Sequence, residues 1–519
     1  MTRIRGLHKS ICIAAVCLSS SPIFSVNLLE VYNQAAKSDP IFAQALSTWQ
    51  SQKMKLPIAE AGYFPTLATT ADANNTTTQY YPAISTQING ALVGYGYSLT
   101  LTQPILDFAA WTQIRGAKNT VKAATATYLA AQQSLMQRTA TAYFDVLQAY
   151  DRLHYTIANK RAVWQQYVTA REQFKVGLVA ITDKYDARSR YDQVVAQQIS
   201  AQNGLNDALE NLRAITGQYY RSLTGLGKRI PFIMPTPNNI DQWVDVANKQ
   251  NYSLIAQAYT VQAAMDNIKQ QASAGYPLLN AQGNYTENRQ TGNHLNSGLP
   301  NNSGVETTVV GLNLTYNPFQ GGLVTASIKQ ARYDYVTASG LLEQTHRDVV
   351  NKTRSNFLGV LSGISQIKAD KQRIISSKNA FAATEAGFKV GTRTMVDVLN
   401  DLTTLYQAQQ QYANDQYAYI DSLIALKAAA GTLSVNDLQA INLWLNQSIV
   451  FPAQLSVAHV PADDIGMNHH PLNNIREESV KDIIQHHIQP DIRLLPTRSQ
   501  PQKTPVKTPV TLPAPTNSQ

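Results

Sequence analysis

Side chains that could do chemistry are few in this sequence, and they do not gather into a recognisable site. Five of the nine histidines follow Pro452, among them the pairs His469-His470 and His486-His487. These pairs could bind a metal ion loosely, but solvated histidines in a proline-rich tail are the simpler interpretation. No Ser/His/Asp set, metal-ligand spacing or phosphate-binding loop occurs, and the other histidines are scattered: His8, His154, His294 and His346. We therefore predict no catalytic residue, no cofactor, no metal site and no enzymatic activity.

Residues 1–25 have the pattern of a secretory signal peptide. Basic residues come first, an apolar run covers Ile11 to Leu18, and Ser25 offers a small residue for cleavage. An N-terminal membrane anchor is disfavoured because the apolar run is too short to span a bilayer. Both cysteines, Cys12 and Cys17, lie in this segment, so the secreted chain would have no disulfide and no thiolate metal ligand.

Charge is sparse over the rest of the chain. Charged residues make up 15% of the sequence, and the formal net charge of +9 at pH 7 includes three basic residues of the predicted signal peptide. No basic patch interleaved with aromatic side chains stands out, which argues against a nucleic-acid partner. Gln, Ala, Thr, Asn and Tyr are plentiful instead. Such a polar but sparsely charged surface is expected for a protein that contacts both water and partner chains.

One stretch of the chain occurs twice. Residues 172–217 and 386–431 align without a gap at an offset of 214, with 13 of 46 positions identical. Both copies contain Phe-Lys-Val-Gly and then continue for about 40 residues without proline, which is typical of a turn followed by the returning helix of a hairpin. The sequence therefore predicts two similar halves, a first structural repeat over 26–230 and a second over 231–447.

Very long helices are predicted in both halves. They cover about 107–175 and 182–216 in the first repeat, and about 321–389 and 396–431 in the second. Apolar and small residues recur along them at spacings of three and four, as in a coiled coil. The longer helices would extend roughly 100 Å at 1.5 Å per residue, about three times the bilayer core.

Two pairs of alternating segments precede the long helices. Strands are predicted at about 63–78 and 91–104 in the first repeat, and at about 275–289 and 305–318 in the second. Their length, period-two alternation and aromatic ends match membrane β-strands, although the segments alone would fit two soluble hairpins equally well. No run of 18 apolar residues follows the signal segment, so we predict no membrane-spanning helix.

Four strands per chain have a consequence if they lie in a membrane. The smallest barrels have about eight strands, and an open sheet edge does not survive in lipid. Other copies of the chain must then complete the barrel. The predicted fold class is therefore mixed α and β, with four transmembrane β-strands per chain in a shared barrel, continued by a long α-helical coiled-coil barrel.

The remaining segments lack such regularity. Residues 219–242 contain three prolines, and we interpret them as an irregular connector on the outside of the helical body. Residues 448–519 are rich in Pro, Asn, Ser and His, which predicts a largely disordered tail.

Several strings of residues are specific enough to indicate a family. They are Thr-Ala-Tyr-Phe at 141–144, Val-Gly-Leu-Val-Ala-Ile-Thr-Asp at 176–183, Leu-Arg-Ala-Ile-Thr-Gly at 212–217, Val-Gly-Thr-Arg-Thr at 390–394, Val-Asp-Val-Leu at 396–399 and Thr-Thr-Leu-Tyr at 403–406. With these strings the chain resembles, from about residue 27 to 445, the TolC family of outer-membrane efflux and type I secretion channel-tunnels.

The resemblance implies an assembly and its partners. It implies a homotrimer with a shared 12-stranded barrel in the outer membrane and a helical tunnel in the periplasm. It also implies a passive exit duct for drug efflux or type I protein secretion. A periplasmic adaptor (membrane fusion) protein and an inner-membrane pump or ABC transporter would load the substrate and supply the energy.

The resemblance also assigns a gate at the periplasmic mouth. Thr182 and Asp183 match the family's acceptors of polar links, Arg393 matches a donor, and Phe388 stands where the family has a second donor, a Tyr. A guanidinium can fork onto a carboxylate, so this link would hold the helices closed and could be remade after opening. The hydroxyl link of the Tyr is missing from this chain.

Pore-lining and docking residues follow from the resemblance as well. The family lines its constriction with two Asp one helical turn apart, which match Asp397 and Asn400, so a trimer would carry three inner carboxylates instead of six. Asp401 is adjacent but points about 100° away on an ideal helix. Without the resemblance, Asp397 would be a solvated charge. The residues expected to dock the adaptor are Val176, Gly177, Leu178, Val390, Gly391 and Thr392.

The alternative is a structural or adhesive coiled-coil protein of the cell surface that encloses no conduit. Such a protein would account for the long helices and the signal segment. It would not account for the paired hairpins or for the turn strings, and a single-channel recording would separate the two interpretations.

Overall fold

The computed structural model describes residues 25–80, 88–227, 230–292 and 302–451 of the 519-residue chain. The predicted signal peptide, apart from Ser25, and the predicted tail from residue 452 onwards lie outside the described residues.

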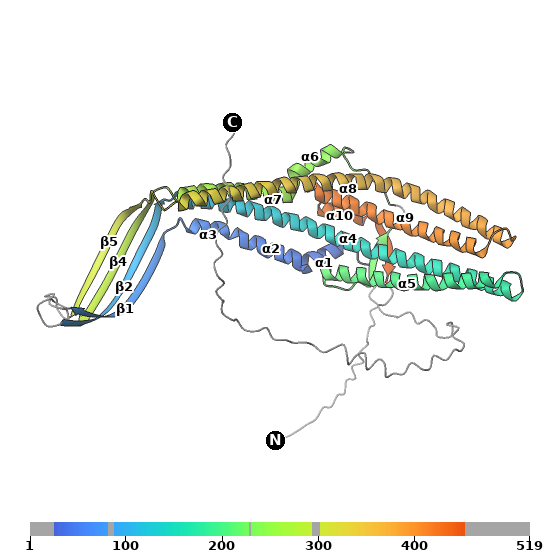
Figure 1. The fold of residues 1–519 in the computed structure, drawn as a ribbon, viewed down its shortest axis with the longest axis horizontal. Coiled ribbons are helices and arrows are strands. Elements are labelled where there is room, and N and C mark those ends of the chain that lie inside the picture. Colours follow the sequence, from blue (N-terminus) through green and yellow to red (C-terminus); the bar gives the residue numbers. More distant parts are fainter. Residues whose placement is uncertain (1–24, 81–87, 228–229, 293–301, 452–519) are drawn as a thin grey trace, which may run out of the picture. The chain divides into compact units, whose positions relative to one another are not determined.

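Four long strands form one antiparallel sheet (Figure 1). The strands β1 (Thr66–Tyr80), β2 (Ile88–Leu106), β4 (Leu278–Gly292) and β5 (Asn302–Thr315) lie in the order β1-β2-β4-β5. Strands β2 and β4 belong to different repeats but pair along most of their length, so each repeat contributes one hairpin to the sheet. Strands β1 and β5 are its two edges, and neither edge is paired with another described segment of the chain.

The two faces of this sheet differ in chemistry. Residues that pair across a ladder point to the same face, and their neighbours along the strand point to the other. One face carries exposed large apolar side chains: Leu67, Val93, Tyr95, Tyr97, Leu99, Leu101, Val310, Leu312 and Leu314. The other face is mainly small and polar, with hydrogen bonds between Thr70 and Ser98 (2.8 Å) and from Asn284 to Thr100 (2.8 Å).

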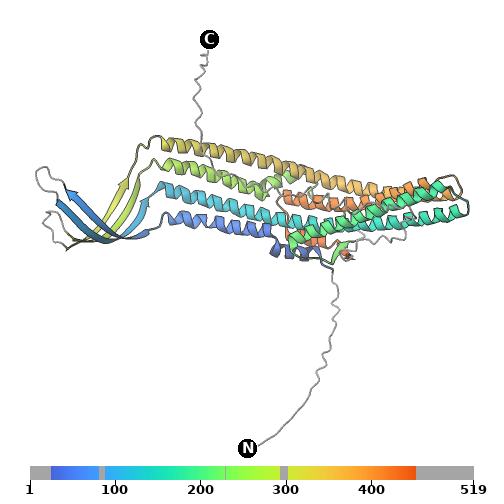
Figure 2. The same cartoon turned by 60° about the horizontal axis from the view of Figure 1, so that its bottom comes forward.

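Each hairpin leads into a long helix that turns back as a second one (Figure 2). In the first repeat these are α4 (Phe108–Lys175) and α5 (Ile181–Thr216), and in the second α8 (Leu323–Lys389) and α9 (Met395–Ala429). The offset of 214 relates the ends of the two pairs to within one residue. Helix α4 packs along α5, α8 packs along α9, and α9 also contacts α4 and α5.

The starts of the long helices have local causes. The Asp107 side chain accepts a hydrogen bond from the Ala110 N–H (2.8 Å) and so caps α4. Helix α8 begins at Leu323 because Gly321 and Gly322 have φ angles of 60° and 87°, a backbone conformation that few residues other than glycine adopt.

Shorter elements complete the fold. They are α1 (Leu28–Ser38), α2 (Pro40–Lys53), α3 (Lys55–Ala61), β3 (Ser222–Leu226), α6 (Ile240–Gln250), α7 (Tyr252–Ser273), α10 (Val435–Asn442) and β6 (Leu445–Val450). Helix α7 packs along both α4 and α8, and α2 and α3 pack along α4.

Strands β3 and β6 correct two predictions. Residues 219–242 are not wholly irregular, because β3 lies within them and pairs antiparallel with β6. The tail cannot begin at residue 448, because β6 continues to Val450. This two-stranded sheet joins segments more than 200 residues apart, so no local pattern predicts it. Tyr143 of α4 contacts this sheet, because its hydroxyl donates to the Thr224 carbonyl (2.5 Å).

The apolar core has two parts. The larger one surrounds Leu135, Tyr143 and Phe144 of α4 and includes residues of α1, α5, α9, α10 and the small sheet. The smaller one lies toward the turns of the helical hairpins and includes Val163, Tyr167, Ala187, Met395, Val398, Leu399 and Leu402. Over the described part of the chain, none of the helices combines the length and hydropathy that a bilayer crossing requires.

Candidate functional site

The two helical hairpins end in the same kind of turn. After α4, the Gly177 N–H donates to the Phe174 carbonyl (3.0 Å) and the Leu178 N–H to the Gln173 carbonyl (2.9 Å). After α8, Gly391 and Thr392 repeat both bonds, at 3.0 and 2.9 Å. The two glycines have φ angles of 74° and 78°, so each turn is a Schellman motif that depends on glycine.

Apolar side chains project from both turns. Val176, Leu178 and Val390 are 70%, 73% and 75% exposed. A Cβ atom added to Gly177 or Gly391 would have no neighbouring atom within 4 Å. Exposed apolar side chains beside bare backbone are typical of a surface that a partner covers. The six residues expected to dock an adaptor therefore lie at the tips of the hairpins, three on each.

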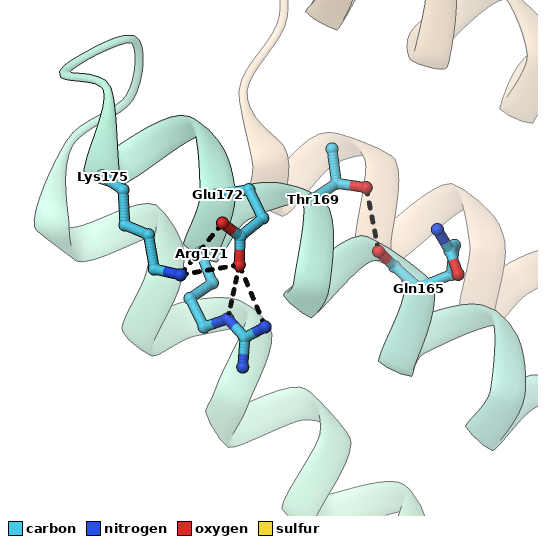
Figure 3. Close-up of polar contacts among 5 residues, drawn as sticks. All are labelled: Gln165, Thr169, Arg171, Glu172 and Lys175. Carbon is cyan, nitrogen blue, oxygen red and sulfur yellow. Dashed lines mark hydrogen bonds and ion pairs between the residues drawn. The ribbon is translucent and has the colours of Figure 1, made fainter.

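Charged groups near the first turn are already paired (Figure 3). The Glu172 carboxylate accepts hydrogen bonds from Lys175 Nζ (3.0 Å) and Arg171 Nε (3.0 Å), and these cations lower the pKa of its carboxyl group. Thr169 donates to the Gln165 carbonyl of its own helix (3.0 Å). All three charged side chains are exposed, so this cluster contributes little to stability and has no free cation to offer.

The predicted gate residues lie beside the two helix turns. Thr182 and Asp183 lie in the first turn of α5, and Arg393 is exposed in the turn before α9. Among the described residues, no hydrogen bond or ion pair joins Arg393 to Thr182 or to Asp183. The guanidinium and its predicted acceptors are therefore available to a neighbouring chain.

The end of α8 determines where Arg393 lies. A Cβ atom on Gly387 would be 2.8 Å from Arg393 Cγ, so the missing side chain lets Arg393 fold against the last turn of α8. Phe388 is half-buried and packs against the smaller apolar cluster. The position at which the family has a Tyr thus contributes an apolar contact in this chain.

Asp397, a predicted pore residue, has a structural role as well. Its carboxylate accepts from the N–H (3.0 Å) and the hydroxyl (2.9 Å) of Thr394, and its own N–H donates to the Thr394 hydroxyl (3.2 Å). This capping box starts α9. Donation from Thr394, together with the nearby Arg393, lowers the pKa of Asp397. The Thr-x-x-Asp spacing would have revealed the cap in the sequence.

Asn400 and Asp401 are both held by neighbouring helices. Arg190 of α5 donates through Nη2 to Asn400 Oδ1 (2.6 Å), and Thr384 of α8 donates to Asp401 Oδ2 (2.5 Å). Sequence reasoning missed Arg190 because its partner is 210 residues away. The second predicted pore position therefore lies beside a cation of the same chain. Within the described ranges, no cluster of three or more His, Cys, Asp or Glu could hold a metal ion.

Comparisons with known proteins agree with this geometry. The sequence matches the family described as outer membrane efflux protein over residues 31–218 and 243–432. It is 36% identical to the outer membrane protein TolC of Escherichia coli K12 over 428 residues, 82% of this chain and 86% of TolC. It is 25% identical to the alkaline protease secretion protein AprF of Pseudomonas aeruginosa over 439 residues, 82% of this chain and 89% of AprF.

Solved structures show the same fold at lower identity. The outer-membrane channel OprN superposes with a TM-score of 0.66 at 16% identity, covering 78% of this chain and 90% of OprN. The CmeC outer membrane channel of Campylobacter jejuni gives 0.65 at 17% identity, covering 86% and 98%. The family predicted from the turn strings is confirmed, and so is the outer-membrane location. The chain therefore belongs to the outer membrane efflux protein family, the TolC-related outer-membrane channels with a helical part in the periplasm.

Proposed function

We propose that three copies of this chain assemble into a passive exit duct, with a shared 12-stranded barrel in the outer membrane. Support comes from the sheet, which has two edges unpaired among the described residues and one face rich in large apolar side chains. The charged residues of that face, Glu287, Arg289 and Glu306, lie toward the β4–β5 loop. Lipid offers no hydrogen bonds to an open edge, so strand β1 of one copy would pair with β5 of the next. The mainly polar face would then line the lumen.

The cargo follows from the relatives only as a class. The relatives of this chain include TolC, of the efflux family, and AprF, a protease secretion protein. We assign the duct to drug efflux, type I protein secretion or both. A periplasmic adaptor and an inner-membrane pump or ABC transporter would provide the energy, because no nucleotide-binding sequence occurs in the chain. Residues 26–230 and 231–447 would act as two equivalent halves of each subunit, after removal of a signal peptide.

The gate would be closed by links between subunits. In the described part of the chain Arg393 has no bond to Thr182 or Asp183, so we propose that it forks onto these residues of a neighbouring copy in the closed trimer. Phe388 would contribute packing to the closed state without a polar link. The pore would be constricted by Asp397, with Asn400 one turn further along α9.

Assembly and conduction test this proposal together. Detergent-solubilised protein is expected to be trimeric by light scattering and to form discrete channels in planar bilayers. A stable folded monomer would contradict the shared barrel. A trimer that never conducts, even with Arg393 replaced by Ser, would instead support the structural or adhesive alternative.

The acidic ring gives a separate prediction. Asp397→Asn is expected to abolish block of the channel by a polyvalent cation, because the ring of three carboxylates would be lost. The block in the unchanged protein should weaken at high salt. Unchanged block and cation selectivity in Asp397→Asn would show that Asp397 does not line the constriction.

Arg190 determines how the second ring must be restored. Asn400→Asp alone would place the new carboxylate beside the guanidinium of Arg190, which would neutralise much of its field. Stronger block is therefore expected from Asn400→Asp combined with Arg190→Gln than from Asn400→Asp alone. Arg190→Gln by itself is the matched control.

A further inference from the structure

A pair of carboxyl groups joins the two helices of the second hairpin. Asp370 of α8 is only 2% exposed. Asp415 of α9 interacts with it across the helix interface, through a hydrogen bond and charge repulsion. One oxygen of each group has an amide partner: Gln366 Nε2 lies 3.5 Å from Asp370 Oδ1, and Gln411 Nε2 lies 2.9 Å from Asp415 Oδ1. The second oxygen, Oδ2, is buried in both groups and has no partner among the described residues.

Two buried carboxylate oxygens without donors are costly unless one of them carries a proton. An unsatisfied buried acceptor loses its hydration, and two negative charges repel strongly at short range. A shared proton removes both costs, because the protonated oxygen then donates to the other. Burial and the neighbouring Asp370 raise the pKa of Asp415 to about 6. The stabilisation of the α8–α9 interface by the shared proton is thus fully present below the ordinary pKa of aspartate. It is lost as the pH rises through about 6.

Neither carboxylate of this pair forms an ion pair with any of the described residues. Lys368, Lys371 and Arg373 are close to Asp370 in the sequence, but all three are exposed and none forms an ion pair with either carboxylate. From α4, which also packs on α9, Asp151 accepts a hydrogen bond from Tyr417 (2.7 Å). Burial raises the pKa of Asp151, although Tyr417 and His154 act to lower it. Helix α5 meets α9 near the other end of α9, through Arg190 and Asn400.

A second carboxyl group of α9 titrates in a similar range. Burial and the charge of Asp145 on α4 raise the pKa of Asp421 to about 7, although Thr141 donates a hydrogen bond to it (3.2 Å). Asp421 must therefore be kept neutral when the response of the Asp370–Asp415 pair is measured.

The fold itself does not require the Asp370–Asp415 pair. At the offset of 214, Asp370 corresponds to Thr156 and Asp415 to Ala201 of the first hairpin. Ala201 is 2% exposed, and the Thr156 hydroxyl donates to the Arg152 carbonyl of its own helix (2.7 Å). The same helix interface therefore packs without carboxyl groups in the first repeat.

We propose that Asp370 and Asp415 form a proton-dependent clasp between α8 and α9. With one proton shared, the clasp holds the second hairpin together, and with both groups ionised the helices separate. The first hairpin has no such clasp, so only the second responds to pH. Helix α9 begins at the turn that carries Arg393, so the clasp would couple pH to the gate. This coupling rests on the proposed function, whereas the separation of the helices does not.

The test measures the helix separation directly. Spin labels are attached to Asn379→Cys and Gln407→Cys in the second hairpin, and to the equivalent Gln165→Cys and Gln193→Cys in the first. All four positions are exposed, and the natural cysteines lie within residues 1–25. Labelled chains are diluted with unlabelled chains, so that only distances within one subunit are recorded at about pH 5 and about pH 8. For a group with a pKa near 6, the ionised fraction rises about tenfold over this interval.

The expected result is a longer and broader distance distribution at the higher pH in the second hairpin only. Asp370→Asn and Asp415→Asn should each remove this change, because the new amide donates to the remaining carboxylate at every pH. The change should persist in an Asp421→Asn background. Equal distances at both pH values in the unchanged protein would overturn the clasp, and so would a persisting response in the two Asn variants.

Channel recordings of the same proteins separate the clasp from the gate. If the second hairpin opens with pH but conductance does not follow, the clasp stands and its coupling to the proposed gate fails. If the distances do not change with pH, the clasp fails, and the duct and gate are then tested by the Arg393 variants alone.

Discussion

Arg393→Ser is expected to raise the conductance of the trimer in planar bilayers to near that of an open channel. The substitution removes a charge-assisted link, which typically contributes about 1.5–3 kcal/mol, from every subunit. Each lost link should shift the balance between closed and open mouth by about tenfold or more. The effect should be large because Phe388 has no hydroxyl with which to support the closed state.

Three variants show whether the guanidinium itself is responsible. Lys389→Ser removes an exposed cation from the end of α8, where it pairs with Glu385 (3.4 Å). This variant should leave conductance unchanged. Arg393→Lys keeps the charge without the fork and should open the mouth partly. Phe388→Tyr adds a hydroxyl donor and should close the mouth more tightly, by about 0.5–1.5 kcal/mol per subunit. Equal conductance of Arg393→Ser and the unchanged channel would remove Arg393 from the gate.

The helical part of the fold has strong local signals in the sequence. Long stretches without proline and apolar residues at spacings of three and four favour helices wherever they occur. The repeated Phe-Lys-Val-Gly string indicates where α4 and α8 end, because glycine allows the positive φ that closes a Schellman turn. The small sheet of β3 and β6 has no comparable signal. Its strands are short, and each is stabilised by a partner more than 200 residues away in the sequence.

The candidate site likewise has a part with local sequence signals and a part without them. The turn residues could be predicted because they are contiguous in the sequence and their strings are specific to the family. The contact between Arg190 and Asn400 could not, because it joins two repeats through side chains that no spacing relates. The burial of individual carboxyl groups could not be predicted from the sequence either. Asp207 and Asp421 occupy equivalent positions, yet Asp207 is exposed and Asp421 is half-buried beside Thr141 of α4.

Gly177→Trp and Gly391→Trp are each expected to block export while leaving the trimer and its barrel intact. No atom lies within 4 Å of a Cβ at either position, so the indole would project beyond the turn and would not clash within the chain. A docking partner must approach this bare backbone closely, and a large side chain would obstruct it. Losing a central contact typically costs about 2 kcal/mol or more, so export of a fluorescent efflux substrate from cells should fall by more than about tenfold.

Backbone strain must be separated from this obstruction. Both glycines have positive φ, and any residue with a side chain costs about 1–2 kcal/mol there. Gly177→Asn and Gly391→Asn are the matched controls, because Asn tolerates this conformation and its side chain is small. If the turns dock the adaptor, the Asn variants should export nearly normally and co-purify with it after crosslinking, whereas the Trp variants should do neither. Loss of export in both kinds of variant would point to distortion of the turn. Normal export in both Trp variants would remove the tips from the docking surface.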